Sequence, residues 1–196
     1  MQEELILPQD LHIHTIFSSH DSAVVSEQTL DLIAKFRHAK SIGISDHLDN
    51  LIEDNSFNNY ERMVRSYNFH LGIEVDGAEW VNVAKNLNVD YYIYHCHNQE
   101  YDYTGVDDLL STNRPVIIAH PNALGTNLDI VNPDAIIEIN NRYIWRCNWK
   151  EKYKKYVDKF KFVINSDAHQ PHWLNQNIAR KVAKELGIKE YLIFDR

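Results

Sequence analysis

Residues 115–121 read PVIIAHP: four consecutive apolar residues lead directly into a histidine and a proline. A strand with one face in water alternates apolar and polar residues, whereas a strand covered on both faces does not need to. This run therefore predicts a strand buried on both faces, which is typical of parallel sheets in α/β proteins. Residues 135–137, Ala-Ile-Ile, indicate a second strand of the same kind.

Short apolar segments of this type alternate along the chain with longer segments at helical spacing. We expect strands at residues 11–14, 41–45, 71–75, 90–94, 115–119, 135–139 and 161–165. We expect helices at residues 26–40, 57–69, 78–87, 106–112, 149–159 and 175–186, with at most a short helix or a loop between 120 and 133. Because parallel neighbours need long crossover connections, this alternation implies an α/β fold with parallel pairing. An open doubly wound sheet and a closed barrel both fit, and we prefer a compact (β/α) barrel of the TIM-barrel type.

The composition limits the class of protein. The chain has 196 residues, enough for one buried core, so we expect a single domain over residues 1–196. Its net charge of −8, without a basic stripe, disfavours tight binding of long nucleic acid. Cys96 and Cys147 lack the spacing of a disulfide framework. With no signal-peptide pattern and no apolar run of about 20 residues, we expect a cytoplasmic protein that does not enter the membrane.

Histidines and acids gather where the predicted strands end. The chain has 11 histidines, and the strand ends carry His12, His14, Asp46, His47, Glu74, His95, His97, His120, Glu138, Asn140, Asp167 and His169. Active sites of parallel α/β folds form at the carboxyl ends of the strands, and histidine is the commonest metal ligand. The sequence therefore predicts a metal site at that end of the fold.

Individual residues leave alternatives open. His12 and His14 lie on one face of a strand and can grip one ion, although either can equally be a hydrogen-bonded core histidine. Glu74 is costly to bury unless it bridges cations or forms a salt bridge at the rim. His20 lies in a loop that can fold back over the site, where Asp21 competes with it as a ligand. We expect structural or surface roles for His38, His70 and His172.

These motifs, in this order, resemble the PHP family, named for its polymerase and histidinol phosphatase members. The matching segments are Asp10-Leu11-His12-Ile13-His14-Thr15, Gly43-Ile44-Ser45-Asp46-His47, Leu71-Gly72-Ile73-Glu74, Ile118-Ala119-His120-Pro121 and Asn165-Ser166-Asp167-Ala168-His169. The resemblance implies a distorted barrel of seven β/α units around two or three divalent ions, zinc, manganese or iron. It assigns His12, His14, Glu74 and Asp167 to the first ion. It assigns Glu74, His97 and His120 to the second, and His20, His47 and His169 to the third.

The resemblance also implies hydrolysis of a phosphate ester by metal-activated water, with a small phosphorylated substrate. Ser19 stands where members that cleave nucleic acid often have an aspartate, which favours phosphomonoesters. His95 replaces the serine of many members and can be a further ligand, a proton donor or an outer-shell group. Asp46 is a candidate for orienting His47. Arg142 and Arg146 can reach a phosphate or can be solvated surface charges.

Three other functions fit parts of this pattern. A phosphodiesterase or exonuclease acting on short nucleic acid would use the same metals, but the acidic balance and the absence of an inserted lid disfavour long polymers. A catalytically silent metal-binding module would be expected to have an incomplete ligand set. A barrel amidohydrolase would need a lysine at the end of a middle strand, and the sequence has none there.

Overall fold

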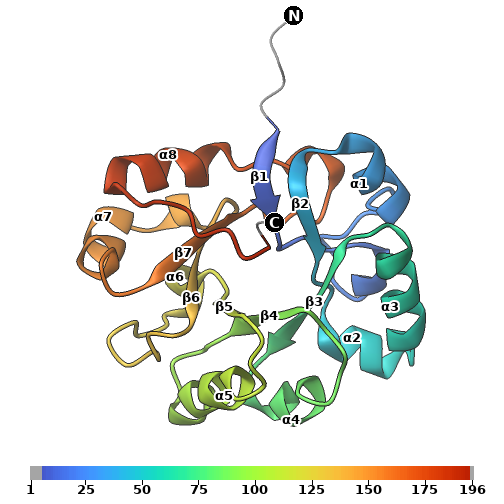
Figure 1. Ribbon diagram of the computed structural model, residues 1–196, viewed down its shortest axis with the longest axis horizontal. Coiled ribbons are helices and arrows are strands. Elements are labelled where there is room, and N and C mark those ends of the chain that lie inside the picture. The colour runs from blue at the N-terminus through green and yellow to red at the C-terminus, as the bar shows by residue number, and fades with distance from the viewer. Residues whose placement is uncertain (1–5, 195–196) are drawn as a thin grey trace, which may run out of the picture.

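The computed structural model describes residues 6–194. These residues contain one all-parallel sheet of seven strands in the order β1-β2-β3-β4-β5-β6-β7. The sheet curls into a nearly closed barrel with eight α-helices around its outside (Figure 1). The expected α/β, TIM-barrel-like fold is therefore confirmed. The strands are β1 (Leu7–Asp10), β2 (Ala39–Ile44), β3 (His70–Asp76), β4 (Tyr91–His95), β5 (Val116–Ile118), β6 (Ile136–Asn140) and β7 (Lys161–Asn165).

The helices lie mostly between consecutive strands, as right-handed parallel connections require. They are α1 (Leu30–Phe36), α2 (Leu48–Glu53), α3 (Phe57–Ser66), α4 (Val81–Ala84), α5 (Glu100–Leu110), α6 (Pro121–Leu124), α7 (Trp149–Tyr153) and α8 (Asn177–Leu186). No helix within residues 6–194 combines the length and the apolar character needed to cross a membrane.

A small apolar cluster fills the inside of the barrel. It consists of Leu11, Tyr91, Ile93, Ile117, Ala119, Ile136 and Val163. Tyr91 is its largest member and is fully buried. A Cβ atom at Gly72 would lie 2.3 Å from the Tyr91 ring, and one at Gly43 would lie 2.3 Å from its hydroxyl oxygen. The two glycines therefore leave room for the tyrosine, whose hydroxyl donates to the backbone oxygen of Leu11 at 2.6 Å.

Side chains close the seam between β1 and β7. The Asn165 side chain accepts a hydrogen bond from the Leu11 amide at 2.9 Å, and the Asp10 carboxylate accepts one from the Ser166 amide at 3.0 Å. The Gln176 side chain donates to the backbone oxygens of both Gln9 and Ile164, each at 2.8 Å. The barrel is distorted here because these side chains replace much of a regular backbone ladder.

Several predicted boundaries are wrong, and the first strand is the most important. We expected it at residues 11–14, but it ends at Asp10, because the Leu11 amide bonds to a side chain rather than to a neighbouring strand. Beyond it, Ile13 forms only an isolated bridge with Ala168. His12 and His14 therefore lie just past the strand rather than within it.

The helix boundaries also differ from those expected. The helix expected at residues 26–40 covers only Leu30–Phe36, because the Thr29 side chain caps its start and Arg37 adopts a left-handed conformation at its end. Residues 39–40 belong to β2. The helix expected at 106–112 begins at Glu100, where the Asp102 carboxylate accepts a hydrogen bond from the Gln99 amide. Helix α2 was not expected at all.

Candidate metal centre

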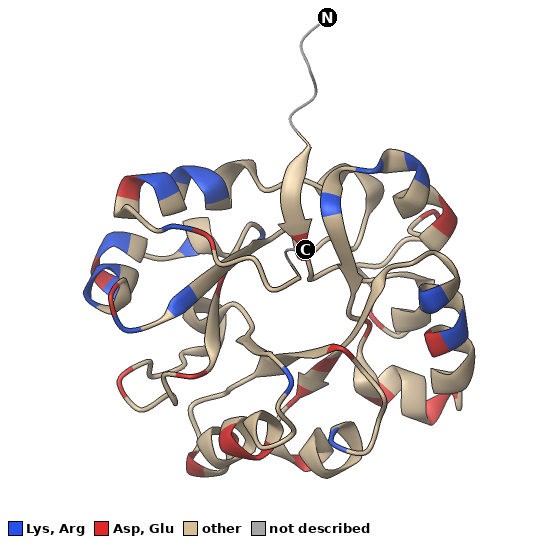
Figure 2. Cartoon of the chain, viewed as in Figure 1, with Lys and Arg blue, Asp and Glu red and all other residues tan. Residues whose placement is uncertain are grey.

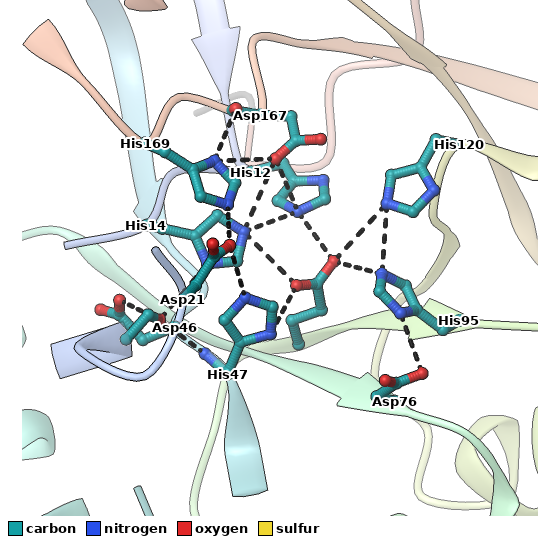
Figure 3. A network of polar contacts seen from close by, with 12 residues as sticks. His12, His14, Asp21, Asp46, His47, Asp76, His95, His120, Asp167 and His169 are labelled. Atoms are coloured by element: carbon teal, nitrogen blue, oxygen red, sulfur yellow. Dashed lines mark hydrogen bonds and ion pairs between the residues drawn. The ribbon is translucent and has the colours of Figure 1, made fainter. Parts of the chain in front are cut away.

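Glu74, on β3, is the centre of a buried cluster at the carboxyl ends of the strands. Figure 3 labels the five histidines of this cluster, His12, His14, His47, His95 and His120. Its Oε1 lies 2.7 Å from His95 Nε2, 3.0 Å from His12 Nε2 and 3.8 Å from His120 Nε2. Its Oε2 lies 3.1 Å from His47 Nδ1 and 3.4 Å from His14 Nε2. The side chain is only 2% exposed, so five imidazoles from four segments converge on one buried carboxylate.

Four overlapping sets of ligand atoms are close enough to share an ion. Three lie mostly buried: His12, His14 and Glu74; Glu74, His95 and His120; and His14, His47 and His169. The fourth, Asp76, His95 and His97, is more exposed. Asp167 approaches the first set, with its Oδ1 3.7 Å from the Nε2 atoms of both His12 and His14. Imidazole nitrogens combined with carboxylate oxygens suit zinc, manganese or iron.

Unsatisfied polar atoms support the fit to cations. Glu74 Oε1, His47 Nε2 and His120 Nδ1 are buried and form no hydrogen bond within residues 6–194. Glu74 Oε1 is near two nitrogens, but no hydrogen bond of acceptable geometry joins it to either. Buried polar atoms are normally satisfied, because an unmade hydrogen bond is costly. Nitrogens also face one another, at 3.1 Å between His12 and His14 and 3.2 Å between His95 and His120. The buried cluster could therefore hold divalent metal ions.

The pKa values in the cluster reflect its mixture of like and unlike charges. Burial lowers the pKa of His95, but the carboxylates of Glu74 and Asp76 outweigh it and raise the pKa to about 10. Burial, together with the neighbouring His95, lowers the pKa of His120 to about 3. Burial would raise the pKa of Glu74, yet the surrounding histidines hold it well below its usual value. These shifts favour the charged form of His95 and the neutral form of His120, beside an ionised Glu74.

Glu138, on β6, orients the His12 ring and holds the backbone of His120 in place. Its Oε1 lies 2.7 Å from His12 Nδ1 and accepts a hydrogen bond from the Asn165 side chain at 3.0 Å. Its Oε2 accepts from the His120 amide at 2.8 Å and from the Asn140 side chain at 2.9 Å. Occupying His12 Nδ1 leaves Nε2 free to face Glu74 and Asp167, which is how outer-shell carboxylates orient metal-ligating imidazoles. The sequence placed Glu138 at a strand end but did not indicate this role.

Two residues of the cluster have unusual backbone conformations. His120 has φ 22° and Asp167 has φ 56°, a region that residues with a side chain rarely adopt. Hydrogen bonds hold both in place: His120 through its amide to Glu138, and Asp167 through its Oδ2, which accepts from the Asn140 side chain at 3.0 Å. Backbone strain maintained by surrounding contacts is common at functional sites.

The structure brings Asp21, rather than His20, to the third set. Asp21 Oδ2 lies 2.9 Å from His169 Nε2 and 3.5 Å from His47 Nε2. The proximity of His169 and His47 lowers the pKa of Asp21. His20 turns outward, with its side chain 45% exposed and its Nε2 3.2 Å from Asp54 Oδ1. Its assignment as a ligand therefore lacks support from this geometry, and Asp21 is the better placed of the two.

The structure also differs from the expectation for His95 and His97. His95 is the residue beside Glu74 and His120, the position that the resemblance gives to His97. The Nε2 atom of His97 instead lies 2.6 Å from Asp76 Oδ1, and its side chain is 43% exposed. Asp76 also lies 3.0 Å from His95 Nδ1. Asp76, missed in the sequence, follows Glu74 by two residues and so lies on the same face of the strand.

Asp46 does not orient His47 as expected. Its carboxylate accepts hydrogen bonds from the amide and hydroxyl of Thr15, at 2.6 and 2.7 Å, and from the Ser18 hydroxyl at 2.6 Å. Ser18 Oγ in turn lies 3.3 Å from His14 Nδ1. The buried carboxylate therefore fixes the loop after β1 and supports His14 through a serine. Its link to His47 is also indirect, because Ser18 Oγ accepts from the His47 amide at 2.9 Å.

Arg142 brings a positive charge to the cluster. Its Nη1 lies 3.2 Å from His169 Nε2 and 3.8 Å from Asp167 Oδ1. It lines a cavity of about 400 Å³ together with Asp21, His47, Glu74, Asp76, His95, His97, His120, Ala123, Leu124, Tyr143, Asp167 and His169. A larger hollow of about 870 Å³ lies near the amino ends of the strands, around Arg65, His70 and Phe194, but none of the ligand sets found among residues 6–194 faces it.

The histidines expected to be bystanders lie away from the cluster. His38 Nε2 lies 3.0 Å from Asp10 Oδ2, and the His70 ring stacks on Phe194 with the centroids 3.8 Å apart. His172 is exposed. Both cysteines are free thiols, and Cys96 is buried. A scan against protein-family models finds no match, and a search of curated proteins finds no similar sequence.

Proposed function

We propose that this protein is a metal-dependent hydrolase of phosphate esters, most of all of small phosphomonoesters, as its resemblance to the PHP family implies. The observation that carries the proposal is the convergence of five histidines on the buried Glu74 at the wall of an open cavity. Structural metal sites are usually closed, whereas hydrolytic sites keep positions open to water and substrate.

The residues around the cavity have separate roles in this proposal. Glu74 would bridge two ions, with His12 and His14 on one side and His95 and His120 on the other; His47, His169 and Asp21 would hold a third. Bound divalent ions would supply a nucleophilic water at neutral pH and neutralise charge on a phosphoryl group. Arg142 would bind a phosphoryl oxygen, because its guanidinium reaches the cavity beside His169. Glu138 and Asp76 would keep their partner imidazoles in the correct orientation.

The test combines metal analysis with matched substrates. Purified protein is reconstituted with zinc, manganese or iron, and its metal content is measured by mass spectrometry. It is then assayed on para-nitrophenyl phosphate, the corresponding bis-ester, histidinol phosphate and a short single-stranded oligonucleotide. We expect at least two ions per chain and turnover of a monoester. Less than one ion per chain contradicts the metal cluster, and turnover of the bis-ester or oligonucleotide alone contradicts the choice of phosphomonoesters.

A matched pair of variants separates the site from general effects. Glu74→Gln removes the central charge, so we expect turnover to fall by more than about 100-fold, since even outer-shell partners of metal ligands contribute about 10- to 100-fold. Glu185→Gln makes the same change on the exposed surface of α8, where its partner is Lys150, and should leave both metal content and turnover unchanged. Equal activity of the two variants would refute the assigned role of Glu74.

A further inference from the structure

Arg146 is an exposed cation that packs on Tyr143, a residue of the cavity wall. It ends the short 3-10 helix Ile144–Arg146, which follows β6. Within residues 6–194 its guanidinium has no carboxylate at ion-pair distance, although the chain contains 28 acidic residues. It lies instead between two aromatic rings, 4.8 Å from the Tyr143 centroid and 5.1 Å from that of Trp145. Aromatic faces hold a guanidinium in place and leave the N–H groups at its edge free for an anion.

The same row of side chains continues into the cavity. Arg142 lies 5.1 Å from the Tyr143 centroid and 5.0 Å from that of Trp173. The rings at either side reach the metal cluster, with Tyr143 4.7 Å from His120 and Trp173 6.0 Å from His169 between centroids. The two guanidinium groups share Tyr143, so their separation cannot exceed the sum of their distances to its ring. Tyr143 itself lines the cavity, so one aromatic ring links Arg146 to the cavity wall.

Most charged side chains that line the cavity are acidic, so the position of the arginines determines where a bound anion can extend. Asp21, Glu74, Asp76 and Asp167 line the cavity, and Arg142 is the one lysine or arginine in its described lining. Many other basic side chains lie on outer helices such as α7 and α8, whereas α5 carries acidic residues (Figure 2). An anion that extends out of the cavity is therefore drawn along the side formed by residues 142–146.

We propose that Arg146 forms a subsite for a second anionic group, so that the preferred ligand is a small organic phosphate that carries a further carboxylate or phosphate. In this arrangement, which rests on the proposed function, the first phosphate lies at the metal cluster and Arg142. The second anion accepts hydrogen bonds from the edge of the Arg146 guanidinium. Tyr143 and Trp145 are positioning residues, because their rings contact the Arg146 guanidinium rather than the anion.

Binding to matched ligand pairs tests this subsite. Metal-loaded protein is titrated calorimetrically with glycerol 3-phosphate and 3-phosphoglycerate, which differ by a carboxylate, and with fructose 6-phosphate and fructose 1,6-bisphosphate, which differ by a phosphate. We expect the doubly anionic member to bind at least tenfold more tightly in one pair or both, which also shows which second group the subsite takes. Equal dissociation constants within each pair overturn the proposal.

Three variants assign the preference to a residue. Arg146→Gln should reduce the ratio of dissociation constants to about one, and Arg146→Lys should restore part of it, because lysine keeps the charge but not the planar edge. Arg62→Gln is the control: Arg62 is an exposed arginine on α3 that bonds only to Asn59 in the described residues, and its loss changes the net charge equally. Retention of the ratio by Arg146→Gln, or its loss in Arg62→Gln, overturns the assignment.

These measurements distinguish a failure of the subsite from a failure of the proposed hydrolase function. If the metal-loaded protein hydrolyses none of the four esters but shows the binding ratio, the subsite stands and the hydrolase proposal fails. If it hydrolyses singly and doubly anionic esters with equal efficiency and binds them equally, the hydrolase proposal stands and the subsite fails.

Discussion

His95 and His97 lie two residues apart, yet their rings have different surroundings. The ring of His95 spans two carboxylates, with Nε2 2.7 Å from Glu74 and Nδ1 3.0 Å from Asp76. The ring of His97 reaches Asp76 at the rim. An imidazole held by an outer carboxylate on one nitrogen is oriented to bind a cation with the other. His95 therefore has the geometry of a ligand, and His97 that of a neighbour of its orienting carboxylate.

Alanine substitutions distinguish these roles. We expect His95→Ala to lose about one ion per chain or to bind that ion at least about tenfold more weakly, because it removes a ligand nitrogen. His97→Ala should retain the full metal content, and so should the control His172→Ala on the exposed surface. The measurements are metal content after dialysis and affinity by competition with a chelator. Loss of metal from His97→Ala, but not from His95→Ala, would instead support His97 as the ligand, as the family resemblance implies.

The sequence identified most of the residues at the centre but not their individual contacts. His12, His14, Glu74, His120 and His169 could be predicted because each lies near or just past the carboxyl end of a strand, and because these strand ends meet. The choices between His95 and His97, and between His20 and Asp21, could not be predicted, since they depend on the side-chain directions of loops. Glu138 appeared only as a polar residue of the sixth strand, because three of its four contacts come from other segments of the chain.

At the scale of elements, one tyrosine connects three strands to the metal centre. Tyr91, on β4, packs against glycines of β2 and β3, and its hydroxyl bonds to the backbone oxygen of Leu11, which precedes His12. The glycines are needed for this close approach, because the hydroxyl and ring occupy the space of a side chain at Gly43 and Gly72. Packing inside the barrel therefore helps to place the segment that carries His12.

Gly43→Ala tests this packing. The added Cβ would lie 2.3 Å from the Tyr91 hydroxyl oxygen and 2.9 Å from its ring, so we expect the free energy of unfolding to fall by about 1–3 kcal/mol, as in other overpacked cores. Chemical denaturation measures the loss. In Gly43→Ala/Tyr91→Phe the hydroxyl is absent, and the two changes should together cost less than the sum of their separate effects. Simple additivity would show that the clash is relieved elsewhere.

Element types were easier to predict than element ends. Seven strands were expected from short apolar runs, and six of these overlap observed strands. The first fails because Pro8, Gln9 and Asp10 contain no apolar run, while the apolar residues that follow bond to side chains across the seam. Helix α5 begins earlier than expected because its first turn carries exposed Tyr101 and a capping aspartate rather than an apolar face.

At the scale of the molecule, one end of the barrel carries the candidate metal centre and the other is covered by the segment after α8. The carboxyl ends of the strands hold the candidate metal centre. At the other end, the segment after α8 crosses the barrel: the Tyr191 amide donates to the Phe162 backbone oxygen at 2.7 Å, and Gln9 pairs with the backbone of Tyr191 and Ile193 at 2.7 and 3.1 Å. Ile193 and Phe194 pack on the interior cluster that contains Tyr91.

Removal of residues 191–196 tests this division. We expect the truncated protein to unfold at a lower temperature, because it loses three hydrogen bonds that contribute about 1 kcal/mol each and exposes the lower part of the interior cluster. It should still bind its full complement of metal, since no candidate ligand of the cluster contacts the described part of this segment, residues 191–194. Thermal denaturation followed by circular dichroism and metal analysis of the same sample measure both quantities.

An unchanged unfolding temperature would mean that the segment does not close the barrel. Loss of metal from a truncated protein with intact secondary structure would mean that the two ends are coupled through Tyr91 and Leu11, which the Gly43→Ala protein would then reproduce.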